Sequence, residues 1–387
     1  MILLWEILLF LGGLTYLYFI GRILRGLNRL RRQPHRSLPD DELPSVSVVI
    51  AARDEESFIR RTIQAVQAQD YPPDRLEIIV VDDRSTDGTA AVVETLARAD
   101  PRIRLLRQTS VPAGSSPKKG ALETAVRAAA GDVIAATDAD CRPPRGWARK
   151  LVSGLSGGAK MAIGQARFDI GAQPPLWQRM QALDFQSIGL CAAGLAADGF
   201  AFTGNGASLA FRRDFFQKAG GYAGVRQFIS GDDELLLAKA ATILGGVVAV
   251  TGEDAVVPTR AAESLRELWH QRARWGSKGL HYAWSRKLTL MGIFLFLLAL
   301  ATGPLLILMG APWSWWLSAA SLKVALDLTV FLCGVQLFGE VFTGWVFAVT
   351  EIIHAPAMVL FALAGHFSRF EWKGQRFRSR GEARGTA

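Results

Sequence analysis

Acidic side chains follow three of the short apolar segments that this sequence predicts to be buried strands. Asp54 comes after the first segment, Asp83 after the second, and Asp138 and Asp140 after a later one. In a parallel sheet the carboxyl ends of the strands share one edge, so these carboxylates should meet there. They would repel one another unless a cation lay among them, and a site with only oxygen ligands suits Mg²⁺ or Mn²⁺. Taken singly, each cluster is more often a turn or helix-capping acid, and the combination of three clusters at three strand ends favours a site.

Further charged residues could complete a site for a phosphorylated ligand. Lys118 lies with Lys119 at the start of a predicted helix, where it could pair with a diphosphate or simply be solvated. Asp232, Asp233 and Glu234 begin another predicted helix. A carboxylate in that place is commonly an N-cap, and the functional alternative is a general base that deprotonates an incoming hydroxyl.

A third group lies on one face of an amphipathic helix predicted over residues 264–284. Gln271, Arg274 and Trp275 have the spacing i, i+3 and i+4, which places them side by side. The arginine could stabilise the charge of a leaving diphosphate, and the tryptophan offers a flat surface to a sugar ring or a lipid. The alternative is a helix at a membrane interface with aromatic anchors.

The order of apolar and amphipathic segments predicts the scaffold that holds these residues. In the first half, strands alternate with helices, which indicates an α/β fold whose mainly parallel sheet has helices on both faces. The predicted strands of this half cover residues 45–52, 76–81, 103–106 and 132–137, and the predicted helices cover 55–69, 86–99 and 117–130. The second half is less regular, with predicted strands at 159–168 and 207–212 and predicted helices at 175–193 and 232–242.

The composition excludes several classes of protein. The chain has 387 residues, 50% of them hydrophobic, and a net charge of +9. Disorder requires low hydrophobicity, and three widely separated cysteines do not make a disulfide scaffold. The five histidines lack the spacing of a zinc site, and the strands are not followed by the glycine-rich loops of ATPases or dehydrogenases. The basic residues gather beside apolar segments, so we expect a membrane and no nucleic acid as their partner.

The apolar residues gather at the two ends of the chain, which predicts an integral membrane protein. Residues 1–24 would form a retained anchor, and residues 288–365 two to three further transmembrane helices. Between them, residues 43–287 have the composition of a soluble domain, and residues 366–387 form a basic tail. Arginines directly follow the first span, so the positive-inside rule places the domain in the cytoplasm. We therefore expect a protein of the bacterial inner membrane.

The side of the C-terminus is ambiguous in the sequence. The basic tail favours the cytoplasm, whereas three full crossings after the domain would put the tail outside. We therefore expect one segment, around Pro356, to be re-entrant or interfacial. In the preceding segment Lys323 and Asp327 lie four residues apart on one helical face, and they should pair with each other or face the protein.

In combination, five motifs resemble the membrane-anchored family-2 glycosyltransferases. The motifs are VSVVIAARDEE, IIVVDDRSTDGT, DAD, GDDE and QRARW, and they occur in the order typical of that family. The resemblance covers about residues 46–275, and the C-terminal FEWKGQRFR is similar to the tail of some lipid-modifying members. It implies a GT-A fold, in which a nucleotide-binding sheet is merged with an acceptor-binding half.

The resemblance also implies a role for each acid of the sheet edge. Asp54 and Asp83 would contact the base and ribose of a nucleotide sugar. Asp138 would help to hold the nucleotide, and Asp140 would bind the metal on the diphosphate.

Two further motifs acquire roles by the same resemblance. The acid pair would supply the general base, Asp233, but the usual Glu-Asp is Asp-Asp here, so Asp232 and Glu234 remain alternatives. Segment 202–208 would line the acceptor side. The Q-x-x-R-W element is matched by Gln271, Arg274 and Trp275.

Together these features imply an inverting, metal-dependent glycosyltransferase. It would move a sugar from a nucleotide sugar, expected to be UDP-linked, to a membrane lipid or a lipid-linked glycan. One alternative is a processive polysaccharide synthase that exports its product, although such a channel needs more spans than this chain offers. Another is a nucleotide-sugar-binding membrane module without turnover, which would have no use for a rim of repelling carboxylates.

Overall fold

The computed structural model describes residues 1–33, 37–112, 114–243, 245–277 and 284–377. The strands of the central sheet are β1 (Val46–Ala52), β2 (Leu76–Asp83), β3 (Ile103–Gln108), β4 (Val133–Asp138), β5 (Met161–Ile163), β7 (Leu209–Arg212) and β8 (Val247–Ala249). Their order is β3-β2-β1-β4-β7-β5-β8. All neighbouring strands are parallel except β7, which runs antiparallel to both β4 and β5. The predicted mainly parallel sheet is therefore confirmed.

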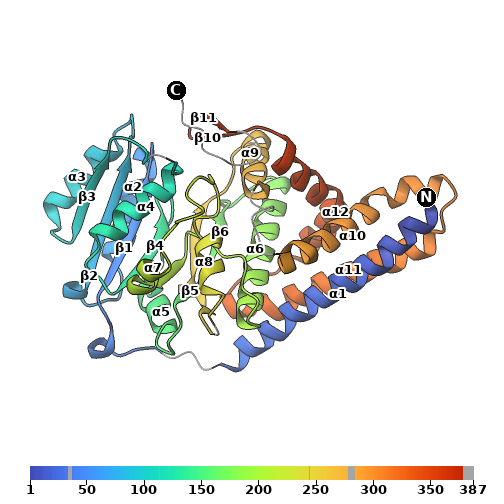
Figure 1. The fold of residues 1–387 in the computed structure, drawn as a ribbon, viewed down its shortest axis with the longest axis horizontal. Coiled ribbons are helices and arrows are strands. Elements are labelled where there is room, and N and C mark those ends of the chain that lie inside the picture. Colours follow the sequence, from blue (N-terminus) through green and yellow to red (C-terminus); the bar gives the residue numbers. More distant parts are fainter. Residues whose placement is uncertain (34–36, 113, 244, 278–283, 378–387) are drawn as a thin grey trace.

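Helices cover both faces of the sheet (Figure 1). One face carries α2 (Glu56–Gln67) and α3 (Thr89–Ala99), and the other carries α4 (Pro117–Ala128). Successive strand side chains point to opposite faces. Val48 and Ile50 of β1 therefore share a core with Ile59 of α2, whereas Val49 shares a core with Leu122 of α4. Because both faces are buried, the strand reads as a continuous apolar run.

The second half departs from the predicted pattern at a glycine. Residues 159–168 form two strands instead of one, because the chain leaves the central sheet at Gly164. A Cβ atom at this position would lie 2.2 Å from Ser208 Oγ and 2.5 Å from the carbonyl oxygen of Ala255, so only glycine fits. The second piece, β6 (Gln165–Asp169), pairs with β9 (Val256–Arg260) in a separate sheet.

The remaining helices of the domain are α5 (Trp147–Gly154), α6 (Leu176–Ala197), α7 (Arg213–Lys218), α8 (Glu234–Ala240) and α9 (Leu265–Gly276). The helix predicted over residues 264–284 is thus shorter than expected. It ends at Gly276, where a Cβ atom would lie 3.0 Å from the carbonyl oxygen of Phe361. Residues 278–283 lie outside the described residues.

Four of the described helices are long and apolar enough to cross a membrane. They are α1 (Ile2–Arg32), α10 (Trp284–Leu308), α11 (Trp313–Gly334) and α12 (Gly344–Phe367). One is N-terminal and three are C-terminal, in agreement with the upper count from the sequence. In Figure 1, α1, α10 and α11 extend together away from the domain, and the contacts among these helices agree.

A buried lysine joins two of these helices. The Nζ atom of Lys323 lies 2.8 Å from Asp327 Oδ2 and 2.6 Å from Glu351 Oε2 of α12. The predicted pairing with Asp327 is confirmed, and the structure adds the second carboxylate. Two anionic partners compensate the cost of a cation in apolar surroundings.

The last part of the described chain returns to the domain. α12 is continuous through Pro356, and its expected re-entrant or interfacial placement stays a prediction. After α12 the chain forms a hairpin of β10 (Phe370–Trp372) and β11 (Gln375–Phe377). This hairpin packs on α9 (Figure 1).

Two glycines let the anchor helix α1 approach the domain closely. A Cβ atom on Gly26 would lie 1.8 Å from the carbonyl oxygen of Gly194 in α6, and one on Gly194 would lie 2.7 Å from the carbonyl oxygen of Ile23. Next to this contact, Arg22 and Arg25 form ion pairs with Asp198, at 2.5 and 2.6 Å. The anchor therefore packs closely against α6.

We expect Gly26→Leu to lower the melting temperature of the purified protein in detergent by several degrees. Overpacking of a tight contact typically costs about 1–3 kcal/mol. The matched control is Gly21→Leu, because Gly21 is on the same helix and a Cβ atom there would have nothing within 4 Å. Equal melting temperatures for the two variants would contradict the close packing of α1 on α6.

Candidate active site

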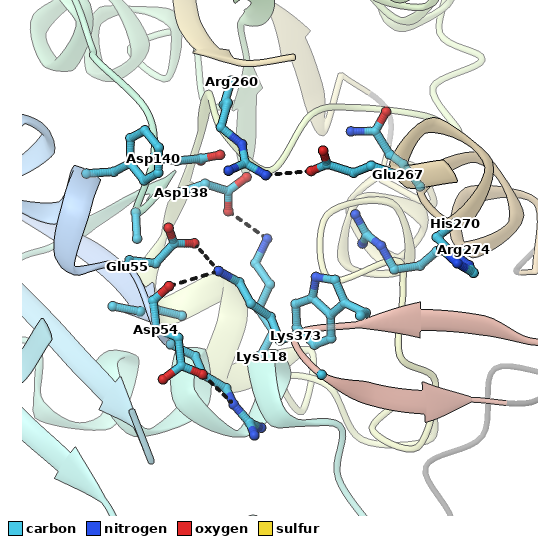
Figure 2. A pocket seen from close by; sticks show the side chains of 18 of the residues that line it. Asp54, Glu55, Lys118, Asp138, Asp140, Arg260, Glu267, His270, Arg274 and Lys373 are labelled. Atoms are coloured by element: carbon cyan, nitrogen blue, oxygen red, sulfur yellow. Dashed lines mark hydrogen bonds and ion pairs between the residues drawn. The ribbon is translucent and has the colours of Figure 1, made fainter. Parts of the chain in front are cut away.

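A cavity of about 550 Å³ opens at the carboxyl ends of β1 and β4. Figure 2 shows it from close by, with charged side chains converging from the sheet, from α9 and from the C-terminal hairpin. The residues predicted from the sequence that line it are Asp54, Asp83, Lys118, Asp138, Asp140, Gln271 and Arg274. The structure therefore brings these seven residues together, and their roles stay predictions.

The strand register explains why the acids meet. Ala52 of β1 pairs with Asp82 of β2, and Ala51 pairs with Asp138 of β4. The chain crosses from one side of β1 to the other between β3 and β4, so β1 and β4 flank a topological switch point. Ligands of open α/β sheets bind at such points, beyond the carboxyl ends of the strands.

Two residues at this edge adopt left-handed backbone conformations. Asp54 has φ +50°, and its Oδ1 atom accepts a hydrogen bond from the backbone N–H of Thr86 at 2.8 Å. Arg84 has φ +58°, and its Nε atom lies 2.9 Å from Asp83 Oδ1. Such conformations are rare outside glycine, and they turn both carboxylates at the ends of β1 and β2 toward fixed partners.

Lys118 joins the sheet edge to the acid pair at the start of α8. Its Nζ atom lies 2.7 Å from Asp138 Oδ1 and 2.9 Å from Asp232 Oδ2. Burial opposes the ammonium charge, but these two carboxylates prevail and hold the pKa of Lys118 well above its ordinary value. The neighbouring Lys119 points the other way, and its buried ammonium donates to the carbonyl oxygens of Phe228 and Ser230.

The three acids of the GDDE motif have different surroundings. Asp232 is bound by Lys118, whereas Asp233 Oδ2 accepts a hydrogen bond from the N–H of Gly206 at 2.9 Å. Glu234 Oε1 accepts a hydrogen bond from Thr203 Oγ1 at 2.7 Å. None of these acids is among the described residues that line the cavity, and Asp232 is connected to it through Lys118.

The Q-x-x-R-W element is divided between the cavity and the core. Gln271 and Arg274 line the cavity from α9, and burial lowers the pKa of Arg274 although several carboxylates oppose that shift. The described part of the chain offers Arg274 no carboxylate within ion-pair distance. Trp275 lies elsewhere: its ring stacks on Phe185 at a centroid distance of 5.6 Å and lies 4.8 Å from the guanidinium carbon of Arg272.

Asp138 and Asp140 have the chemistry of a site for a hard divalent cation. Their carboxylate oxygens and the sulfur of Cys141 lie within 4.8 Å of one another. Burial raises the pKa of the Cys141 thiol well above its usual value, and hard divalent cations prefer oxygen ligands, so we expect the two carboxylates to be the ligands. Burial, and then the charge of Asp138, raise the pKa of Asp140. A bound Mg²⁺ or Mn²⁺ would relieve that repulsion, so these residues fit the predicted metal.

This constellation can be compared with known proteins. Residues 47–220 match the family described as Glycosyl transferase family 2. The chain carries a family-2 glycosyltransferase domain.

Two curated relatives of this glycosyltransferase domain are bacterial proteins. The beta-monoglucosyldiacylglycerol synthase of Synechocystis sp. is 30% identical over 291 residues, which are 70% of this chain and 58% of that protein. The probable glycosyltransferase YdaM of Bacillus subtilis is 32% identical over 246 residues, which are 62% of this chain and 56% of that protein. The chain therefore spans somewhat more than half the length of these two relatives.

Solved structures identify the fold of the glycosyltransferase. The mannosyltransferase PcManGT of Pyrobaculum calidifontis, in complex with GDP-Man and Mn²⁺, matches with a TM-score of 0.53 and 23% identity. The match covers 91% of this chain and 99% of that chain. The GT-A fold implied by the sequence motifs is thereby confirmed.

Several residues of the glycosyltransferase cavity were not predicted individually. Glu55, Arg260, Glu267, His270 and Lys373 line it together with the predicted residues. Glu55 directly follows a predicted site residue, and Lys373 belongs to the FEWKGQRFR tail, so both carried a signal. Arg260 and Glu267, which form an ion pair, carried no signal, because the course of the short turn between the end of β9 and the start of α9 decides whether they meet.

We expect Asp140→Asn to weaken Mn²⁺ binding by the full chain by about tenfold or more, because it removes a charged oxygen ligand. Isothermal titration of the purified protein with MnCl₂ measures this. Asp74→Asn is the matched control, since Asp74 is exposed on a 3₁₀ turn away from the cavity. Unchanged Mn²⁺ affinity in Asp140→Asn would exclude Asp140 as a metal ligand.

Proposed function

We propose that this protein transfers a sugar from a nucleotide sugar to a hydroxyl group of a membrane lipid, with inversion at the anomeric carbon. The observation that carries the proposal is the single cavity in which acids from three strand ends face Arg274 of α9. Such a cavity suits a ligand that combines a nucleoside, a diphosphate and a sugar. The family-2 domain around it supports the same reaction class.

The donor would lie along the sheet edge. Asp54 and Asp83 would contact the base and ribose, and Asp138 and Asp140 would hold Mg²⁺ or Mn²⁺, which when bound neutralises the departing diphosphate as a Lewis acid. Arg274 points its guanidinium into the same cavity and would add a second positive charge at the phosphates (Figure 2).

Asp233 is the best candidate for the general base. Burial would raise the pKa of Asp232, but Lys118 and Lys119 outweigh burial and lower it, so this carboxylate is a weaker base and is already bound by Lys118. Asp233 instead accepts hydrogen bonds from backbone N–H groups of Gly206 and Glu234. Gly206 belongs to the segment expected on the acceptor side, and glycine there permits close approach of an acceptor to the carboxylate.

The position of the cavity supports an amphiphilic acceptor. α9, which forms one wall, packs on α12, and α6 of the same domain packs on α1 and α12. A lipid headgroup could therefore reach the cavity while its chains stay in the bilayer. The name of the Synechocystis relative, a monoglucosyldiacylglycerol synthase, points to the same class of acceptor.

Membranes that contain the full chain should incorporate label from a nucleotide sugar into a lipid that carries a single added sugar. A panel of radiolabelled UDP and GDP sugars, with product identification by mass spectrometry, tests this. Asp233→Asn should lower turnover by on the order of 10²-fold, whereas the exposed Asp214→Asn should not. A long polymer as the product would favour the processive synthase, and donor binding without turnover would favour a binding module.

We also propose that the domain is cytoplasmic and that only α1, α10 and α11 cross the membrane. The hairpin after α12 lies against α9, so the chain starts and ends the α10–α12 segment on the domain side. A chain that leaves one side of the membrane and returns to it crosses the membrane an even number of times. If two of the helices α10, α11 and α12 cross, the third lies in the membrane interface. α12 is that helix, because it packs along α9 and α6 of the domain. The arginines at the domain end of α1 favour the cytoplasm as that side.

Labelling of single cysteines tests this topology in a chain whose three native cysteines have been replaced. Ser314→Cys lies in the exposed start of α11, and Arg376→Cys lies in the exposed part of β11. In spheroplasts, a membrane-impermeant maleimide should label Ser314→Cys at once and Arg376→Cys only after permeabilisation. Labelling of Arg376→Cys from outside would contradict the proposed side of the tail.

A further inference from the structure

The C-terminal hairpin forms part of the cavity wall. Residues 371–374 line the same cavity as Asp54 and Asp138, although about 230 to 320 residues separate them along the chain. Figure 2 shows Lys373 reaching from the hairpin toward Asp54 and Glu55, on the side of the cavity opposite α9. A cation from the very end of the described chain thus lies beside the acids of the first strand.

The hairpin is fixed to the helix that carries Arg274. Phe370 is fully buried in a small apolar cluster with Ile229, Ala273 and Ala364. The backbone N–H of Glu371 donates to His270 Nδ1 at 3.2 Å, and the Glu371 carboxylate lies 3.3 Å from Arg266. These contacts hold the hairpin on α9 and set the position of its turn.

The turn itself is demanding for a lysine. Lys373 has φ +48° and Gly374 has φ +71°, so both central residues of this two-residue hairpin turn are left-handed. Glycine and asparagine adopt that conformation readily, whereas another residue pays about 1–2 kcal/mol. The backbone therefore does not favour lysine at this position. The reason for a lysine here should lie in what its side chain contacts.

The Lys373 ammonium is held in the cavity by few partners. Its Nζ atom lies 2.7 Å from Glu55 Oε1 and 3.4 Å from the carbonyl oxygen of Asp54. The side chain is 27% exposed, so part of it faces the open cavity. Two other cations that line the cavity are held by stronger sets of carboxylates: Lys118 is shared by Asp138 and Asp232, and Arg260 is paired with Glu267 and Glu263.

We propose that Lys373 binds the phosphates of the nucleotide-sugar donor and that the C-terminal hairpin thereby completes the donor site. The inference rests on the proposed function. A diphosphate adds negative charge to a cavity whose acids already repel, and ammonium donors placed at the rim stabilise it. Trp372 of the same hairpin would also contribute to the donor site. Its ring lies over the guanidinium of Arg274, 5.6 Å from the guanidinium carbon, and Arg274 is the other cation proposed to face the phosphates.

A purely structural role makes a different prediction. If the Lys373–Glu55 ion pair only tied the hairpin to the loop after β1, removal of either partner would lower the affinity for UDP to the same extent. If Lys373 binds phosphate, removal of Glu55 frees the ammonium and does not weaken phosphate binding. Lys373→Met and Glu55→Gln therefore separate the two roles.

The experiment measures dissociation constants of UDP and of uridine for the full chain in detergent with Mn²⁺. Lys373→Met should weaken UDP binding by about tenfold or more, the usual effect of losing a hydrogen bond to a charged group, and leave uridine binding unchanged. Lys373→Arg should keep most of the UDP affinity, and Glu55→Gln should bind UDP as well as or better than the wild type. Lys218→Met, at an exposed lysine on α7, is the matched control.

Two results would overturn the inference: wild-type UDP affinity in Lys373→Met, or equal losses in Lys373→Met and Glu55→Gln. Retained uridine binding shows that the variants keep the cavity. If the wild type bound neither UDP nor GDP, the proposed function would fail together with this inference. Equal binding of UDP by the wild type and Lys373→Met would remove the inference alone.

Discussion

Negative charge gathered at one edge of a buried sheet has to be balanced, and the domain is arranged around that requirement. Lys118 lies between Asp138 and Asp232, and so connects the sheet edge to the start of α8. Arg274 enters from α9 and Lys373 from the C-terminal hairpin. Each cation comes from a different element, so the electrostatic balance of the cavity depends on how separate parts of the chain pack together.

Close helix packing links this site to the apolar helices. α9 forms a wall of the cavity with one face and meets α12 with another, where Gly276 and Gly365 allow near contact of the two backbones. α6 approaches α1 in the same way through Gly26 and Gly194. The apolar helices are therefore continuous with the wall of the cavity, which fits the proposed transfer from a donor in water to an acceptor in the bilayer.

Local patterns in the sequence predicted much of this arrangement. The apolar runs marked β1, β2 and β4 because both faces of these strands are buried, and the acids that follow them had to share an edge once the strands were parallel. The antiparallel β7 and the break at Gly164 were missed. Both depend on contacts between distant segments, such as the proximity of Gly164 to Ser208, which leave no periodic signal in the chain.

The sequence by itself determined which side chains share a strand end or a helical face, because the backbone repeats set that spacing. Only the tertiary structure decided what each face meets. It turned Lys118 into the cavity and Lys119 into the core, and it placed Arg274 at the cavity but Trp275 against Phe185. The tertiary structure also returned the C-terminal hairpin to the domain. Phe370 of the hairpin is buried against Ala273 of α9, and no local pattern in the sequence specifies such a long-range contact.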